Sequence, residues 1–587
     1  MSKRVSEDAN LSTIAPIAAP AAVTRARTFG LDLSMPVLLA FVAILVVLIV
    51  VPMAWLVVYA FTTKAGVFTF DNFTRLFTDS TFLEPLLTTL TIATSVGIVC
   101  CVVAAPIAWL VARTDMPLRG LVRTLIMASF VTPPFLGAIA WELLAAPNSG
   151  LLNQLYRGVT GAPADDALFN IYSLGGLIFV ICCYTFPYVF VLVANALDRI
   201  PGELEDASSM LGGRTWTTAR RVTIPLALPA LLAGLLVAFL QALNLFGSPA
   251  ILAIPAGFNT LTTKIWTLFQ FPPKPELAAA ASLPLLLLTI GLLRAQSRVL
   301  SKGGYSVVGG KYGAPRLVPL GWWRWPSIVL CLGLLCLPVF LPYGALLNAA
   351  FSKTASRLVS PETFTMSNFY FTFFELSQTR RVLFNTFSLA ALTATLGTIL
   401  ALVIAYMVAR KSVPGSRFLA ALATAPIAIP GIVLGVGLFL SYTRPPLVLY
   451  GTLWILAIAY VTIELPSAYQ QLQSAFHAVH PELEEASRIL GATRLQALRQ
   501  ITAPLLRTGV IATWCFIFVA VVRELSAAII LFTSDTKVMS VLIFDLKESG
   551  DLGAIAVLGL VMLAMSAAVI VAANRIPGFG VTKMRST

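Results

Sequence analysis

The sequence predicts an all-α membrane protein, a polytopic bundle of about 12 transmembrane helices arranged as two six-helix repeats. Three observations lead to this prediction. Hydrophobic residues make up 58% of the 587 positions and charged residues only 11%, whereas soluble domains carry about 25% charged residues. Charge-poor runs long enough to cross a bilayer recur along the chain, and several motifs occur twice in the same order. This composition excludes a soluble enzyme, a disordered protein and a secreted disulfide scaffold.

Twelve stretches of the chain are expected to cross the membrane. A helix needs about 20 apolar residues to span a bilayer. The run 277–293 is short for a span, and the run 450–472 contains Glu464. The expected spans are 37–61, 86–112, 124–143, 174–196, 228–252, 277–293, 327–351, 383–409, 418–441, 450–472, 509–532 and 553–573.

The cationic residues predict how these spans are oriented. Twelve spans place both termini on one side, and most of the 40 lysines and arginines fall in the segments on that side. An excess of Lys and Arg marks the cytoplasmic face. We therefore expect a multi-pass protein of a bacterial inner membrane, with both termini in the cytoplasm. The net charge of +14 is attributed to loops that orient helices beside membrane lipid, and no nucleic-acid partner is expected.

The two halves of the chain resemble each other. Ala108–Arg113 matches Ala405–Arg410 at an offset of 297 positions, and Glu203–Ser208 matches Glu482–Ser487 at an offset of 279. The difference of 18 residues is assigned to an extra external loop near 145–173. Parallel repeats commonly place the substrate path between the halves. The expected division is a cytoplasmic tail 1–36, a first half 37–296, a cytoplasmic linker 297–325 rich in Gly, Pro and cations, a second half 326–575 and a tail 576–587.

Each half carries one long cytoplasmic segment between its fourth and fifth spans, with a helix-break-helix pattern. A proline begins the first helix, and the acidic residues that follow suit the positive end of its dipole. Gly212 or Gly491 then permits a sharp turn. A basic amphipathic helix follows, and Pro225 or Pro504 marks re-entry into the membrane. Because the pattern occurs at matched positions in both halves, a simple connecting loop is disfavoured.

These segments resemble the EAA loop of ABC importer permeases, E-A-A-x3-G-x9-I-x-L-P. Ser replaces the second Ala in both copies, Asp206 replaces Glu in the first, and Ala503 replaces Leu in the second. The resemblance implies a coupling loop that docks in a groove of a cytoplasmic ATPase, and we expect the second helix, 213–224 or 492–503, to make that contact. The residues expected to form these coupling loops are Glu205, Asp206, Ala207, Gly212 and Pro225 in the first copy, and Glu484, Glu485, Ala486, Gly491 and Pro504 in the second.

The chain also resembles the fused, two-permease type of ABC importer permease, most closely that for ferric iron. The resembling stretches are Phe246–Ala250, Pro255–Phe258 and Arg523–Ala527. The resemblance implies two copies of a cytoplasmic ABC ATPase subunit, a periplasmic substrate-binding protein and ferric iron as the substrate. Thiamine, aminoethylphosphonate and polyamine are alternative substrates. A secondary transporter driven by an ion gradient is a further alternative, which the matched loops disfavour.

Three charged residues, Glu464, Arg523 and Glu524, fall inside or at the edge of expected spans. A charge inside a membrane is unfavourable unless it is paired or faces an aqueous cavity, so these residues either line the translocation path or lock helices together. Adjacent residues on a helix point apart, so Arg523 is expected to pair with Glu464 in the structural alternative. Asn244 and Leu245 occupy the matched positions in the first half, which makes the charged site asymmetric.

The sequence contains no catalytic, metal-binding or cofactor-binding pattern. All seven cysteines fall in apolar runs and are expected to be small buried side chains. His477 and His480 lie three positions apart without a third ligand. The nucleotide-binding pattern G-x4-G-K-[S/T] is absent. We therefore expect a transporter subunit that is not an enzyme and holds no cofactor or metal, with ATP hydrolysis by a separate partner.

Overall fold

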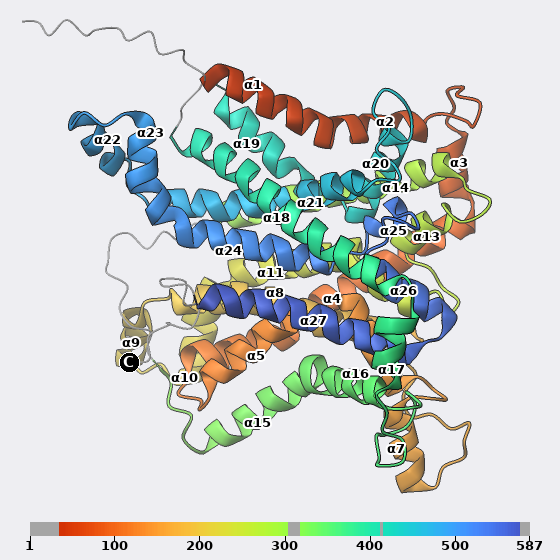
Figure 1. Cartoon of the computed structure of the whole chain (residues 1–587). Helices are drawn as coiled ribbons and strands as arrows, with labels where there is room; N and C mark the ends of the chain where they lie inside the picture. The colour runs from red at the N-terminus through yellow and green to blue at the C-terminus, as the bar shows by residue number, and fades with distance from the viewer. Residues whose placement is uncertain (1–33, 303–316, 411–414, 576–587) are drawn as a thin grey trace, which may run out of the picture.

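The computed structural model describes residues 34–302, 317–410 and 415–575. These residues form one bundle of helices that run side by side (Figure 1). The described chain contains three isolated β-bridges and no strand. The fold is therefore all-α, as the composition predicts.

The first half contains its helices in the following order. They are α1 Ser34–Leu45, η1 Val46–Val50, α2 Val51–Ala60, α3 Asp71–Thr78, α4 Ser80–Arg113, α5 Arg119–Val131, α6 Pro134–Ala145, α7 Leu151–Thr160, α8 Leu174–Asp198, α9 Gly202–Met210, α10 Thr215–Thr218, η2 Ala219–Thr223, α11 Ile224–Asn244, α12 Gly247–Leu252, α13 Leu261–Thr267 and α14 Pro275–Lys302.

The second half repeats this order, without a counterpart of α7. Its helices are η3 Gly321–Trp323, α15 Arg324–Leu335, η4 Cys336–Phe340, α16 Leu341–Phe351, α17 Ser367–Tyr370, η5 Phe371–Glu375, α18 Thr379–Ala409, α19 Ser416–Thr424, η6 Ala425–Ala428, α20 Gly431–Tyr442, α21 Leu453–His477, α22 Pro481–Ile489, α23 Arg494–Ala497, η7 Leu498–Thr502, α24 Ala503–Val522, α25 Ala528–Leu531, α26 Met539–Ser549 and α27 Leu552–Asn574.

Nine helices of the described chain are long and apolar enough to cross a membrane. Two further pairs, α5–α6 and α19–α20, pass the same test together but bend by 99° and 108°. The tenth expected span corresponds to α21, which contains Glu464 and is not among these helices. It nevertheless packs against α18 as α8 packs against α4. The structure therefore supports the expected layout of two six-helix repeats, with broken helices at two positions.

The expected continuous spans 124–143 and 418–441 are wrong in detail because each one is broken. The break in the first follows Thr132 at Pro133–Pro134, and the break in the second lies at Pro430–Gly431. A proline disfavours helical geometry at the preceding residue and cannot donate a backbone hydrogen bond. Each break therefore leaves a short helix, α6 or α20, that turns back into the bundle.

Three other expected boundaries also need correction. The spans 228–252 and 509–532 end early, because α11 stops at Asn244 and α24 at Val522, and the short helices α12 and α25 follow. The expected linker boundary at 296–297 falls within α14, which continues to Lys302. The tail 1–36, apart from its last residues, the linker residues 303–316 and the tail 576–587 lie outside the described residues.

The first spans of the two halves pack reciprocally on the opposite half. Helix α2 contacts α20, and α16 contacts α6. The Tyr442 hydroxyl donates to the Val47 carbonyl at 2.6 Å, and the hydroxyls of Thr132 and Tyr343 lie 2.7 Å apart. The halves are therefore held to each other by two related interfaces.

The bundle has two distinct ends (Figure 1). Helices α9, α10, α22 and α23 lie at one end, which we call the loop end, together with the start of α1 and the end of α27. Helices α3, α7, α13, α17 and α26 lie at the opposite end, which we call the far end. The two repeated loops therefore project from the same end of the molecule.

Candidate functional site: the repeated loops and the central cavity

The two loops fold as the helix-break-helix pattern predicts. In the first loop α9 ends at Met210, the chain turns through Gly212, and α10 begins at Thr215. In the second loop the corresponding turn contains Gly491. Both glycines have a positive φ, +82° and +94°, in the left-handed region that other residues adopt at a penalty of about 1–2 kcal/mol. An added Cβ would meet no atom within 4 Å at either position, so backbone geometry alone accounts for the glycines.

A buried ion pair fastens the first loop to the membrane helices. Arg113, the last residue of α4, places Nη2 at 2.6 Å from Glu205 Oε2 on α9. Arg113 Nη1 also donates to the carbonyls of Leu197 and Ile200, at 3.3 and 3.1 Å. The Thr223 hydroxyl, at the base of α11, donates to Glu205 Oε1 at 2.8 Å. The carboxylate of Glu205 therefore joins α4, α9 and the base of α11.

The second loop repeats this network. Arg410 donates from Nε and Nη2 to Glu484 Oε1 on α22, at 3.0 and 2.8 Å. The Thr502 hydroxyl, at the base of α24, donates to the same oxygen at 2.6 Å. The first pair is 0% and 7% exposed and the second 10% and 13%, so the first network is the more deeply buried.

The arginine and threonine of each network were not predicted as site residues from the sequence. Each recurs in both halves, Arg113 with Arg410 and Thr223 with Thr502, but their contact with the glutamates depends on how α4 or α18 meets the loop. The expected residues Ala207, Glu485 and Ala486 are exposed, and Asp206 is half-buried. Pro225 and Pro504 lie in the first turn of α11 and α24.

The turn of each loop exposes a pair of large apolar side chains. Met210 and Leu211 are 86% and 89% exposed, and Ile489 and Leu490 are 85% and 89% exposed. They occupy matched positions at an offset of 279. Two such pairs at the loop end, each held on a braced helix, are typical of a surface that contacts another protein. We call them the apolar tips.

A central cavity of about 370 Å³ lies between the halves. Positions that match across the repeat line it from both sides. Thr185 faces the cavity from α8 and Glu464 from α21, while Asn244 lines it at the end of α11 and Arg523 just after α24. The cavity therefore lies at the junction of the two repeats, where the repeat predicts a substrate path.

All three expected intramembrane charges, Glu464, Arg523 and Glu524, line this cavity. Arg523 Nη1 donates to the Phe130 carbonyl at 2.5 Å, and its guanidinium lies 5.2 Å from the centre of the Phe130 ring. Glu524 accepts the backbone N–H groups of Ala527 and Ala528 at 2.9 and 3.3 Å. The expected ion pair between Arg523 and Glu464 is not among the ion pairs of the described residues. Arg523 is held by the first half instead.

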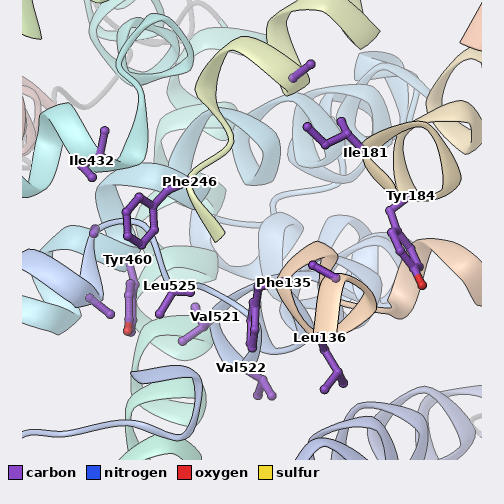
Figure 2. Packing of buried hydrophobic residues seen from close by; sticks show 14 of the residues in the cluster. Phe135, Leu136, Ile181, Tyr184, Phe246, Ile432, Tyr460, Val521, Val522 and Leu525 are labelled. Carbon is purple, nitrogen blue, oxygen red and sulfur yellow. The ribbon is translucent and has the colours of Figure 1, made fainter. Parts of the chain in front are cut away.

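A layer of buried apolar side chains adjoins the cavity, and two of its members, Phe135 and Leu525, line it. Phe246 lies two residues after the end of α11, Leu525 lies three residues after the end of α24, and Phe135 is the second residue of α6. All three are buried (Figure 2). A Cβ added at Gly247 would lie 2.6 Å from the Phe135 Cβ and 3.4 Å from a Leu525 methyl. Phe246 also packs near Trp266 and Phe544. We call Phe135, Phe246 and Leu525 the apolar barrier.

Comparisons with known proteins agree with this architecture. A family model described as "Binding-protein-dependent transport system inner membrane component" matches residues 104–302 and again 397–577. The two matches together cover more than half of the chain and correspond to the two repeats.

Three relatives illustrate the similarity. A ferric transport system permease protein of Actinobacillus pleuropneumoniae is 27% identical over 446 residues, which cover 75% of this chain and 63% of that protein. An Fe(3+)-transport system permease protein of Haemophilus influenzae is 22% identical, over 66% of this chain and 73% of that protein. A spermidine/putrescine transport system permease protein of Escherichia coli is 29% identical over 182 residues, 31% of this chain and 64% of that protein.

The repeated loops, the helices that can cross a membrane and the family matches lead to one conclusion. The chain is a multi-pass inner-membrane permease, and it belongs to the family of binding-protein-dependent transport system inner membrane components.

Proposed function

We propose that this chain is the transmembrane permease subunit of an ATP-driven importer, and that its two loops each recruit one copy of a cytoplasmic ABC ATPase. The observation that carries the proposal is the repeated loop, in which an Arg–Glu–Thr network braces a short helix with an exposed apolar tip. A stiff connection is what a coupling element needs, because movement of a docked ATPase then reaches α4 and α11, or α18 and α24.

The apolar tips suggest where the ATPase docks. On the expected second helix 213–224, Trp216 is 72% exposed, but Thr218 and Thr223 are buried against the molecule itself, so that helix offers a smaller apolar surface than the tip. Met210 with Leu211, and Ile489 with Leu490, are the most exposed large apolar side chains of the two loops. We propose that the end of the first helix and the turn after it enter the groove of each ATPase subunit, with the loop end facing the cytoplasm.

Co-purification of the permease with its ATPase tests this proposal. The wild-type chain is expected to retain two ATPase subunits, Leu211→Asp or Leu490→Asp one, and the double variant none. The control is Leu118→Asp, which introduces the same charge at an exposed leucine between α4 and α5, outside the repeated loops. Two subunits bound to the double variant would contradict the proposal.

Ferric iron is the substrate that we propose, delivered by a periplasmic binding protein. The similarity to ferric transport permeases over most of the chain supports this assignment. The charged cavity, with two carboxylates and one guanidinium, suits a charged or strongly hydrated substrate. The test is uptake of radiolabelled iron, spermidine, thiamine and aminoethylphosphonate by cells that express the system. If the cells took up only one of the other three compounds and no iron, that compound would be the substrate and the iron assignment would be wrong.

A further inference from the structure

We propose that the ion pair between Glu142 and Lys547 is a latch that holds the far end of the two halves together, and that it must open for substrate to reach the central cavity. Lys547 Nζ on α26 lies 2.6 Å from Glu142 Oε1 on α6. The Tyr172 hydroxyl donates to the same carboxylate oxygen at 2.7 Å. The latch rests on the permease function and on the proposed orientation of the far end toward the periplasm. It does not depend on which substrate is carried.

This ion pair differs in kind from the others in the described part of the chain. Arg113–Glu205 and Arg123–Asp198 lie within the first half. Arg381–Asp535, Arg410–Glu484, His480–Glu482 and Lys537–Asp545 lie within the second half. Glu142–Lys547 joins the first half to the second. A change in how the halves meet therefore acts on this pair and leaves the other six intact.

The position of the pair places it between the apolar barrier and the far end. Helix α6 starts at Pro134, which lines the cavity, and ends at Ala145, from which the chain continues into α7 at the far end (Figure 1). Glu142 lies in the last turn of α6, and Phe135 of the apolar barrier lies in its first turn. Along α6, the latch therefore lies closer to the far end than Phe135 of the apolar barrier does.

The repeat contains a second contact at the mirrored position, and its chemistry is different. Helices α6 and α20 correspond at an offset of 297, so Phe439 matches Glu142. Thr89 and Thr386, also 297 apart, each accept the first N–H of a short helix at 2.8 Å, from Leu261 of α13 and Met539 of α26. Leu261 and Met539 are therefore equivalent, so α13 and α26 correspond at an offset of 278 positions.

With that offset, Phe269 matches Lys547. Phe269 and Phe439 pack edge to face, with ring centres 5.3 Å apart. One interface between the halves therefore carries an ion pair where its counterpart carries two aromatic rings. Aromatic contacts lose their stabilisation when they are exposed to water, whereas separated charges regain hydration. The interface with the ion pair is thus the one suited to open, and the aromatic contact is suited to stay closed as a hinge.

The extra external segment completes the latch. Tyr172 ends this segment, and burial, together with the neighbouring Glu142 carboxylate, raises the pKa of its phenol above the ordinary range. The phenol therefore stays protonated and donates to the carboxylate. On α7 of the same segment, the Gln154 amide donates to the Ser356 carbonyl of the second half. The segment near 145–173, which has no counterpart in the second half, thus contacts the interface that carries the ion pair.

Labelling of a cysteine in the cavity tests the latch without ATPase, binding protein or substrate. Ser526→Cys places a thiol in the cavity, and a membrane-impermeant maleimide is added to right-side-out and, separately, inside-out vesicles. Removing one partner of a buried ion pair leaves the other charge buried without compensation, which destabilises the closed arrangement. Glu142→Gln and Lys547→Gln are therefore each expected to raise labelling in right-side-out vesicles about tenfold or more, which corresponds to about 1.4 kcal/mol.

The charge-reversed double variant, Glu142→Lys with Lys547→Glu, is expected to return labelling toward the wild-type rate. Phe439→Leu at the mirrored position is the matched control and is expected to leave labelling within about twofold of the wild-type rate. Unchanged labelling in both single variants, or an equal increase in Phe439→Leu, would overturn the latch. An increase in inside-out vesicles alone would support the latch and overturn the proposed orientation.

Discussion

Arg113 and Glu205 form a buried ion pair, 2.6 Å between Nη2 and Oε2, that ties the end of a membrane helix to the first repeated loop. The side chains are 0% and 7% exposed, while the equivalent Arg410 and Glu484 are 10% and 13% exposed. The two loops thus share one brace, but the brace of the first loop is more fully removed from water.

Neutralising the glutamate should therefore harm the first loop more than the second. Glu205→Gln leaves the Arg113 charge buried without its partner, a loss of about 3–5 kcal/mol for a buried pair. Glu484→Gln leaves Arg410 slightly exposed, at 10% against 0% for Arg113, so the expected loss is smaller than for Glu205→Gln. Thermal unfolding of the two purified variants measures the difference. Glu203→Gln, an exposed position on the same helix, is the control, and equal melting temperatures for Glu205→Gln and Glu484→Gln would contradict the burial argument.

The turn glycine of each loop should be sensitive to any side chain. Gly491→Val forces a β-branched residue to a φ of +94°, which is strongly unfavourable although the space around it is open. The turn is expected to rearrange and the apolar tip to lose its position, while the membrane helices stay folded. Binding of the ATPase by the variant, measured as an affinity, should fall about tenfold or more.

Two further variants separate the effect of the turn geometry from the effects of added side-chain volume and of changed charge. Gly120→Val introduces the same side chain near the same end of the bundle, where the glycine has an ordinary φ and open space, and should bind normally. Glu485→Lys reverses an exposed charge on α22 and should weaken binding without change in the melting temperature. Normal binding by Gly491→Val would mean that the turn geometry is dispensable.

The cavity charges should interact only weakly, because they line one cavity but Arg523 and Glu464 form no direct ion pair among the described residues. Because Arg523 is held by Phe130 and forms no ion pair with Glu464 among the described residues, the effects of Arg523→Met and Glu464→Gln on uptake should add. Residues in direct contact give coupling energies of about 0.5–3 kcal/mol, so a value of no more than about 0.5 kcal/mol is expected here. The measurement is a double-mutant cycle on the uptake rate. A coupling energy well above that value would indicate a direct ion pair between Arg523 and Glu464 and contradict the arrangement described here.

The orientation of the bundle can be read from reporters fused to it. The excess of Lys and Arg on the side of the loops predicts that a reporter after Thr587, or within 300–320, is cytoplasmic, and that one within 150–165 is periplasmic. Alkaline phosphatase and green fluorescent protein fusions report opposite sides. Phosphatase activity at the C-terminus would reverse the proposed orientation of both loops.

The sequence predicts this fold well where the signal is local. Apolar runs locate the helices, and the breaks at Pro133 and Pro430 could have been anticipated, because proline disfavours a helix at the residue before it. The end of α24 at Val522 has no such signal, since neither proline nor glycine lies between Arg523 and Ala527. There the backbone turns so that Glu524 accepts N–H groups of the next short helix.

The same distinction holds for the site. The glutamates and glycines of the loops follow from a repeated local pattern, and the structure places them as that pattern predicts. Contacts between distant segments do not follow from it. Arg113 meets Glu205 only because α4 and α9 converge at the loop end, and Glu142 meets Lys547 across 405 positions of sequence. Such pairs depend on the packing of the two halves, which a single sequence does not specify.

The most direct test of the account is ATP hydrolysis by the permease–ATPase complex in proteoliposomes, with and without the loaded binding protein. The measured quantity is the stimulation caused by the binding protein, compared between the wild type and a variant with one apolar tip disabled, Leu490→Asp. If both loops couple hydrolysis to transport, the single variant should lose nearly all stimulation although the first loop is intact. Stimulation equal to that of the wild type would show that the loops are connectors and that coupling takes another route.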